Sequence, residues 1–111
     1  MEYTVAEEEG NLVIVALKGE VDLKYSADLR KILLDAAAKA GGVVVDMSGV
    51  RMIDSSGIAS LLEAFQTARK RGKGFVLAGA GESVIKVLKL ARLETVFEIV
   101  DDVETACRAV A

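Results

Sequence analysis

The chain has 111 residues, of which 52% are hydrophobic, and it carries a formal net charge of −3. This length fits one domain spanning residues 1–111, and the apolar content excludes wholesale disorder. The negative charge argues against a general nucleic-acid-binding protein, because phosphate backbones are held by clustered Lys and Arg side chains.

Histidine is absent and cysteine occurs once, at Cys107. Without histidine, the chain cannot form a Ser-His-Asp or Cys-His catalytic site and lacks the commonest zinc ligand. With one cysteine, it cannot form an intrachain disulfide. No apolar run approaches the ~20 residues that cross a bilayer, and the first residues lack the pattern of a secretory signal. We expect a cytoplasmic protein that is not an enzyme and binds no metal or cofactor.

Strands and helices alternate along the chain. Strands are predicted over residues 3–7, 12–17, 75–78 and 96–100, and another strand begins at residue 43. One helix is predicted from about residue 55 to 71, and three others begin after Ser26, after Ser83 and after residue 102. Ser26 and Ser83 are expected to cap their helices. The order β-β-α-β-α-β-α-β-α predicts an α/β fold, with a mixed, mostly parallel sheet of about five strands and helices packed against it.

The most informative segment is Asp46-Met47-Ser48-Gly49-Val50-Arg51-Met52-Ile53-Asp54-Ser55-Ser56-Gly57. We interpret its first part as a polar turn, because it follows an apolar strand. Its last part begins a helix, because apolar residues then recur at helical spacing. The N-terminus of a helix has unpaired N–H groups and a positive dipole, so a phosphate at this point would be stabilised. The segment therefore has the features of a switch.

Each polar residue of this junction has two interpretations. Ser55 is either a helix cap or a phosphorylation site. Asp54 caps the helix, orients the Ser55 hydroxyl, or does both. Ser56 supports the first turn, with modification as the lesser alternative. Gly57 allows close approach of a partner or of a neighbouring strand.

Four other features of the chain leave similar alternatives. Glu20 and Asp22 either cap their turn or join Asp54 in a partner surface, since the ends of parallel strands gather on one side. Gly79-Ala80-Gly81 is better explained as a turn than as a phosphate-binding loop, because the third glycine of that fingerprint is missing. The cations among residues 69–73 complement a helix C-terminus or contact an acidic partner. Met52 packs near the switch or is exposed to a partner.

The strand, the segment from Asp46 to Gly57 and the amphipathic helix together resemble a STAS domain, and most of all the stand-alone bacterial anti-sigma factor antagonists. Gly19-Glu20-Val21-Asp22 and the later strand-helix units extend the resemblance over nearly the whole chain. The resemblance implies a binding module whose partner is an anti-sigma factor that is also a serine kinase. It further implies that the kinase phosphorylates Ser55, that a phosphatase restores the free form, and that the unphosphorylated protein captures the anti-sigma factor and frees the sigma factor for transcription.

The partner surface implied by this resemblance consists of Asp22, Asp54, Ser55, Ser56 and Gly57. Other STAS domains are not phosphorylated and occur in anion transporters, lipid-transport complexes and sensory scaffolds, so a non-switching subunit is the alternative. A Ser-Lys hydrolase is a third hypothesis, but no spacing pairs Lys24, Lys73 or Lys86 with Ser55. We expect a monomer or weak dimer.

Overall fold

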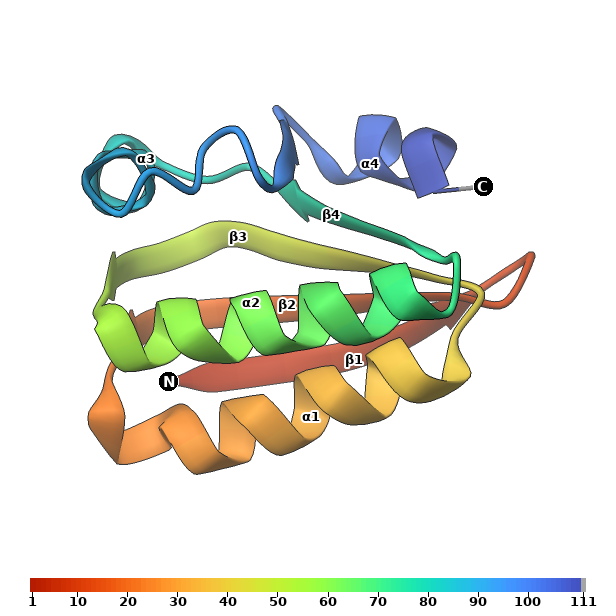
Figure 1. Cartoon of the computed structure of the whole chain (residues 1–111), viewed down its shortest axis with the longest axis horizontal. Coiled ribbons are helices and arrows are strands. Elements are labelled where there is room, and N and C mark those ends of the chain that lie inside the picture. Colours follow the sequence, from red (N-terminus) through yellow and green to blue (C-terminus); the bar gives the residue numbers. More distant parts are fainter. Residues whose placement is uncertain (111) are drawn as a thin grey trace.

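The computed structural model describes residues 1–110, and these form a five-stranded sheet with helices on both faces (Figure 1). The strands are β1 (Glu2–Glu8), β2 (Leu12–Val21), β3 (Gly42–Ile53), β4 (Gly74–Ala78) and β5 (Glu98–Val100), in that order across the sheet. β1 pairs antiparallel with β2, and all other neighbours are parallel. This arrangement confirms the predicted α/β fold and its mostly parallel sheet.

The connections are helical, as parallel strands require. They are the short 3₁₀ helix η1 (Leu23–Tyr25) with α1 (Ser26–Lys39), then α2 (Ser55–Lys70) and α3 (Glu82–Leu90), while α4 (Val103–Val110) follows the last strand. Figure 1 shows α1 and α2 side by side on one side of the sheet, and α4 on the other. Within residues 1–110, no helix combines the length and apolar character needed to cross a membrane.

The core lies in two layers because β2, β3 and β4 bury side chains on both faces. On β2, Val15 and Leu17 point toward the larger layer under α1 and α2, while Leu12 belongs to the smaller layer under α4. The helix α3 also packs against the larger layer, through Val84 and Leu88, which are fully buried. The sheet is thus a rigid frame at whose edge the candidate switch lies.

The strand β3 is longer than the sequence pattern predicted. The residues that we interpreted as a polar turn, 46–51, continue β3, and β2 likewise extends to Val21. The two strands pair along this length with two irregularities of register. The first irregularity lies between Asp46 and Gly49, where Oδ1 of Asp46 accepts hydrogen bonds from the backbone nitrogen and the hydroxyl of Ser48, at 3.0 and 2.7 Å; beyond it, pairing with β2 resumes and keeps the polar segment extended. The predicted turn was therefore wrong.

Both predicted serine caps were also wrong. Ser26 begins α1, but its hydroxyl donates backward to the carbonyl of Leu23, so it closes the preceding 3₁₀ turn. Ser83 lies one residue inside α3, and its hydroxyl donates to the carbonyl of Arg51 at 3.0 Å. This bond ties the start of α3 to the end of β3.

Candidate functional site

The candidate site forms where β2 and β3 end together. Val21 pairs with Ile53 in the sheet, and the Asp54 nitrogen donates to the Val21 carbonyl at 3.1 Å. The residues that follow this pair, Asp22 and Asp54, therefore lie at the same edge of the sheet. The structure thus brings together two acidic residues separated by a whole β-α-β unit, as the sequence predicted.

Asp54 is the N-cap of α2. Its Oδ1 accepts hydrogen bonds from the backbone nitrogens of Ser56 and Gly57, at 3.0 and 3.2 Å, and from the Ser56 hydroxyl at 2.6 Å. The pKa of Asp54 is lowered below its ordinary value, chiefly by the hydroxyl of Ser56; burial opposes this effect, and the backbone donors of Gly57, Leu23 and Ser56 lower the pKa further. The carboxylate is therefore held in its charged form at the positive end of the helix.

The second oxygen of Asp54 reaches the other segment of the site. Its Oδ2 accepts a hydrogen bond from the backbone nitrogen of Leu23 at 3.1 Å. Asp22 in turn caps η1, because its Oδ1 accepts from the Lys24 nitrogen at 3.1 Å. A single side chain thus joins the start of α2 to the loop between β2 and α1. Of the two interpretations of Asp22, the structure shows the cap, while its contact with a partner stays a prediction.

The two adjacent serines have different environments. Ser55 is the first residue of α2 and is exposed. Its hydroxyl makes no hydrogen bond with any residue from 1 to 110. Ser56 is half-buried, and its hydroxyl is held by Asp54. The expectation that Asp54 orients the Ser55 hydroxyl was therefore wrong, and so was the interpretation of Ser55 as the cap.

Gly57 lies in the first turn of α2 and is buried. A Cβ atom placed there would lie 2.7 Å from Cγ1 of Ile53 and 2.9 Å from Cγ1 of Val21. Of its two interpretations, the structure shows the close approach of neighbouring strands. The glycine lets the tip of the helix lie directly on the ends of β2 and β3, and in this way it positions Ser55.

Two exposed apolar side chains belong to the segments that adjoin Asp54. Leu23 is 74% exposed and Met52 is 39% exposed, whereas Met47 is fully buried. The exposure of Met52 was one of its two predicted interpretations. Leu23 was missed, although a large apolar residue between Asp22 and Lys24 in a turn was a usable signal. We call Leu23 and Met52 the apolar rim of the site, because exposed apolar side chains beside polar ones suit packing against another protein.

The remaining polar features are a possible metal site and the glycine-containing loop. Residues 1–110 contain no cluster of three potential metal-binding side chains. In the glycine-containing loop, the nitrogen of Gly79 donates to the Val100 carbonyl, and Gly79 has a positive φ of 70°. Gly79 thus extends the pairing of β4 with β5, and its positive φ bends the chain toward α3, so the segment is a connection between the two elements; phosphate binding by it stays untested.

Comparison with known proteins determines the family. The sequence model of the STAS domain matches residues 3–106, which is nearly the whole chain. The chain belongs to the STAS domain family. The anti-sigma-B factor antagonist of Listeria monocytogenes is 26% identical to this STAS domain over 97 residues, which cover 86% of this chain and 84% of that protein.

A second relative comes from a different functional class. The intermembrane phospholipid transport system binding protein MlaB of Escherichia coli is 32% identical over 79 residues, which cover 71% of this STAS domain and 79% of MlaB. Sequence likeness therefore extends both to regulators of sigma factors and to a transport system.

The fold matches that of the anti-sigma factor antagonist SpoIIAA. Its unphosphorylated form superposes with a TM-score of 0.83 at 17% identity, covering 99% of both chains. The phosphorylated form of SpoIIAA, described as a Bacillus cell fate determinant, gives a TM-score of 0.76 at 16% identity, covering 97% of this chain and 99% of that one. These likenesses show that the STAS domain described here shares the SpoIIAA fold.

Proposed function

We propose that this protein is an anti-sigma factor antagonist whose binding is switched off by phosphorylation of Ser55. In the proposed cycle, the unphosphorylated protein binds an anti-sigma factor that is also a serine kinase, which frees the sigma factor for transcription. The kinase then transfers a phosphoryl group to Ser55, the complex dissociates, and a serine phosphatase restores the free form. The protein acts by binding and catalyses none of these steps.

The exposure and freedom of the Ser55 hydroxyl carry the proposal. A hydroxyl that accepts a phosphoryl group must reach the active site of another protein, and it must not already be engaged. Ser55 meets both conditions, whereas Ser56 donates to Asp54 and is half-buried. The two serines are neighbours in sequence, so this difference in environment is what favours Ser55. The phosphorylated form of SpoIIAA supports such chemistry in a protein of the same fold.

Charge explains how the phosphate would end binding. Phosphorylation adds roughly −1.5 to −2 charges, next to the carboxylate of Asp54 and near that of Asp22. A partner whose cations match two carboxylates, and whose apolar surface covers Leu23 and Met52, would lose both contacts. The phosphoryl group would hold the partner away from the apolar rim and bring a hydrated dianion into the interface.

The proposed partner surface consists of Asp22, Leu23, Met52, Asp54 and Ser55. Ser56 and Gly57, which also belong to the predicted set, support this surface from beneath. Ser56 holds the carboxylate of Asp54, and Gly57 lets the helix lie against the strands. Any direct contact of these two residues with a partner stays a prediction.

A non-switching subunit of a lipid-transport complex is the second candidate function. The likeness to MlaB specifically favours it. Such a subunit would use the same surface to bind a transport protein, and Ser55 would remain unmodified. The two functions differ in whether a kinase recognises this protein, so a phosphorylation assay separates them.

Incubation with ATP and the anti-sigma factor kinases of the source organism, followed by intact mass and peptide mapping, tests the proposal. We expect a single added phosphoryl group on the peptide that contains Ser55. Ser56→Ala should still be modified, and Ser55→Ala should not. A phosphate on Ser56, or no transfer from any of these kinases, would contradict the proposed switch.

A further inference from the structure

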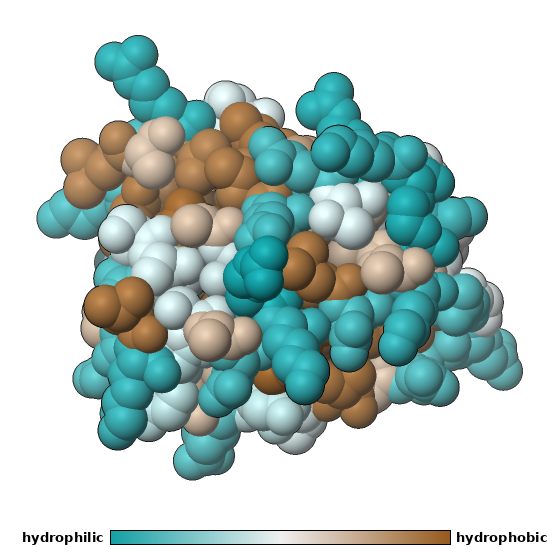
Figure 2. Space-filling model, turned by 60° about the horizontal axis from the view of Figure 1, so that its bottom comes forward, coloured by the Kyte–Doolittle hydropathy of each residue, from teal (hydrophilic) through white to brown (hydrophobic). Residues whose placement is uncertain are grey.

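A second exposed surface lies on α3, away from the hydroxyl. We call it the α3 patch and define it by Ile85, Lys86, Lys89, Leu90 and Arg92. Leu90 is 78% exposed, the most exposed of the large apolar side chains within residues 1–110. It borders a shallow hollow of about 590 Å³ whose other lining residues are Ala80, Glu82, Ile85, Lys86 and Lys89. Figure 2 shows apolar surface at the upper left, the side on which Figure 1 places α3, with hydrophilic side chains beside it.

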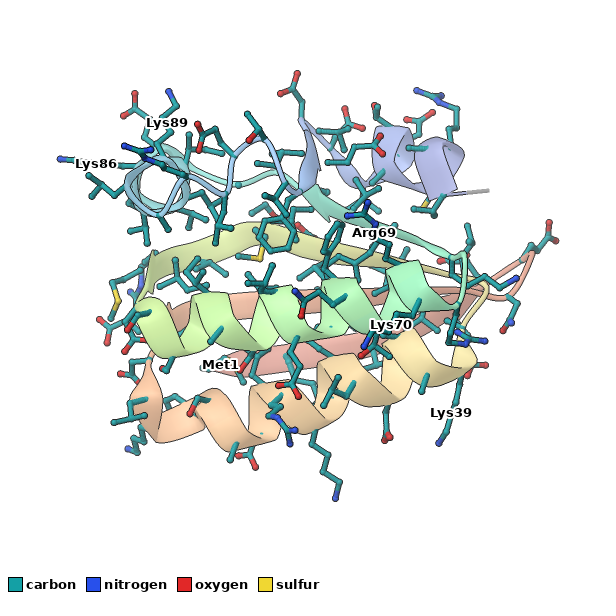
Figure 3. The ribbon with its side chains drawn as sticks, in the orientation of Figure 1. Met1, Lys39, Arg69, Lys70, Lys86 and Lys89 are labelled. Carbon is teal, nitrogen blue, oxygen red and sulfur yellow. The ribbon has the colours of Figure 1, made fainter. Side chains whose placement is uncertain are left out.

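The patch is positively charged although the chain as a whole is not. It contains three cations, and Glu82 is the one acidic residue lining its hollow, whereas the chain has a net charge of −3. Figure 3 shows Lys86 and Lys89 projecting from α3, away from the body of the molecule. Lys89 lies in the last turn, where it complements the helix dipole, but this effect does not explain Lys86 in the middle of the helix.

Arg92 occupies a backbone position that favours glycine. Its φ is 58°, directly after the end of α3, and its nitrogen donates to the Lys89 carbonyl. Helices commonly end with glycine at such a left-handed position, because a Cβ atom there is strained. An arginine at this position adds a third cation to the patch and costs stability, which is typical of a residue kept for binding.

The helix that carries the α3 patch begins near the proposed partner surface. The Ser83 hydroxyl bonds to the Arg51 carbonyl, so the start of α3 is fixed to the end of β3, next to the exposed Met52. A partner that covers Ser55 therefore has α3 within reach. An apolar side chain surrounded by cations is complementary to an apolar side chain surrounded by carboxylates.

We infer that the α3 patch is a second contact area for the kinase that phosphorylates Ser55, and that it binds an acidic face of that kinase around Leu90. This inference rests on the proposed function, because it names the same partner. The patch makes no contact with the reacting hydroxyl, so it holds the kinase without taking part in phosphoryl transfer. Loss of the patch should therefore weaken recognition and leave the rate of transfer in the complex unchanged.

Kinetics of Ser55 phosphorylation test the inference, with this protein as the varied substrate of the kinase. For Lys86→Glu/Lys89→Glu we expect KM to rise about tenfold and kcat to stay within about twofold. Lys39→Glu/Lys70→Glu is the matched control: it makes the same charge change at the far ends of α1 and α2, as Figure 3 shows, and should leave KM unchanged. Leu90→Ser should raise KM severalfold, and Arg92→Gly should raise both KM and the melting temperature.

The outcomes separate this inference from the proposed function. If Ser55 is phosphorylated with the same KM in the control and the α3 variants, the function stands and the docking role of α3 is wrong. If no kinase phosphorylates Ser55, both are wrong. Vesicles of phosphatidylglycerol provide a further probe: binding that is lost in Lys86→Glu/Lys89→Glu, with KM unchanged, would assign the patch to a lipid surface and overturn the inference.

Discussion

At the scale of single residues, Asp54 organises the site. One of its oxygens accepts hydrogen bonds from two backbone nitrogens of α2 that have no partner within the helix. Its other oxygen accepts a hydrogen bond from the loop before α1. It also engages the hydroxyl of Ser56 and so leaves Ser55 as the free hydroxyl of the pair. The same carboxylate that builds the tip of the helix therefore selects which serine is available.

Replacement of Asp54 should reveal both its capping role and its charge. We expect Asp54→Ala to lower the free energy of unfolding at neutral pH by about 1 kcal/mol, the usual cost of removing an N-cap side chain. Asp54→Asn should retain most of that stability, because the amide oxygen still accepts the two backbone hydrogen bonds. Chemical denaturation of the two variants and the wild type measures the differences, with Asp22→Asn as a control at the neighbouring cap.

The acid dependence of stability should also change in Asp54→Asn. The pKa of Asp54 in the folded protein lies below its ordinary value of 3.8. The stabilisation is therefore complete above about pH 4 and is lost as the pH falls through the folded pKa, because the unfolded chain binds the proton more readily. Wild type should lose more stability than Asp54→Asn between about pH 4 and pH 2. Parallel pH profiles in this range would contradict the assignment.

At the scale of the elements, the position of α2 depends on close packing at both of its ends. At the N-terminal end, Gly57 lies against the side chains of Val21 and Ile53. At the C-terminal end, Nη1 of Arg71 donates to the carbonyls of Ala37 and Ala40, at 2.7 and 2.9 Å. The basic segment was expected to complement its own helix, but Arg71 instead caps the end of the neighbouring α1. The two helices are thus fixed side by side.

Gly57→Ala should destabilise the protein even though alanine favours helices. The gain in helix propensity is about 1 kcal/mol at most, whereas overpacking against two core side chains costs about 1–3 kcal/mol. We expect a net loss, measured by thermal denaturation. Ser55→Ala, at an exposed position of the same turn, should stay within about 0.5 kcal/mol of wild type. Equal or higher stability of Gly57→Ala would show that α2 can move away from the strands.

Arg71→Lys should lose most of what the guanidinium provides. A lysine carries the same charge, but its side chain is one atom shorter, so its ammonium does not reach the two carbonyls to which Nη1 of Arg71 donates. We expect a loss of about 1 kcal/mol in unfolding free energy for both Arg71→Lys and Arg71→Ala. Arg69→Ala, two residues earlier and exposed, should change little. Full rescue by lysine would mean that charge alone stabilises the end of α1.

Local patterns predicted the order of the elements but not their boundaries. The alternation of apolar runs with helical periodicity was sufficient for the five strands, the crossovers and the helix that begins at the switch. It failed at residues 46–51, because the bonds between Asp46 and Ser48 accommodate an irregularity of the strand and pairing with β2 continues beyond it. Those interactions depend on side-chain geometry and on a distant strand, neither of which is visible in a local pattern.

The sequence predicted the position of the candidate site, but only some of the roles of its residues. The pattern placed Asp22, Asp54 and Ser55 at one edge of the sheet, where the structure has them. It could not show that the capping residue is Asp54, that Asp54 engages Ser56, or that Leu23 is exposed. A hydroxyl and a carboxylate are equally good caps in a sequence, and the hydrogen bond to Leu23 joins segments 31 residues apart.

At the scale of the whole molecule, the proposed switch residue, Ser55, lies on the surface of a sheet whose core does not depend on it. Ser55 is exposed, while the sheet and its two apolar layers are closed beneath it. The helix dipole attracts a phosphate at this position, and the carboxylate of Asp54 repels it, so the two effects oppose each other. We therefore expect phosphorylation to shift the melting temperature by no more than about 3 °C. The added charge would then act on the binding of a partner and leave the fold in place.

The most direct test of this switch is the affinity of the anti-sigma factor kinase for the two forms of the protein, measured by calorimetric titration. The account predicts that enzymatic phosphorylation of Ser55 weakens binding by about 10- to 100-fold, with the fold and melting temperature preserved. Equal affinity of the two forms, or loss of binding accompanied by unfolding, would contradict it.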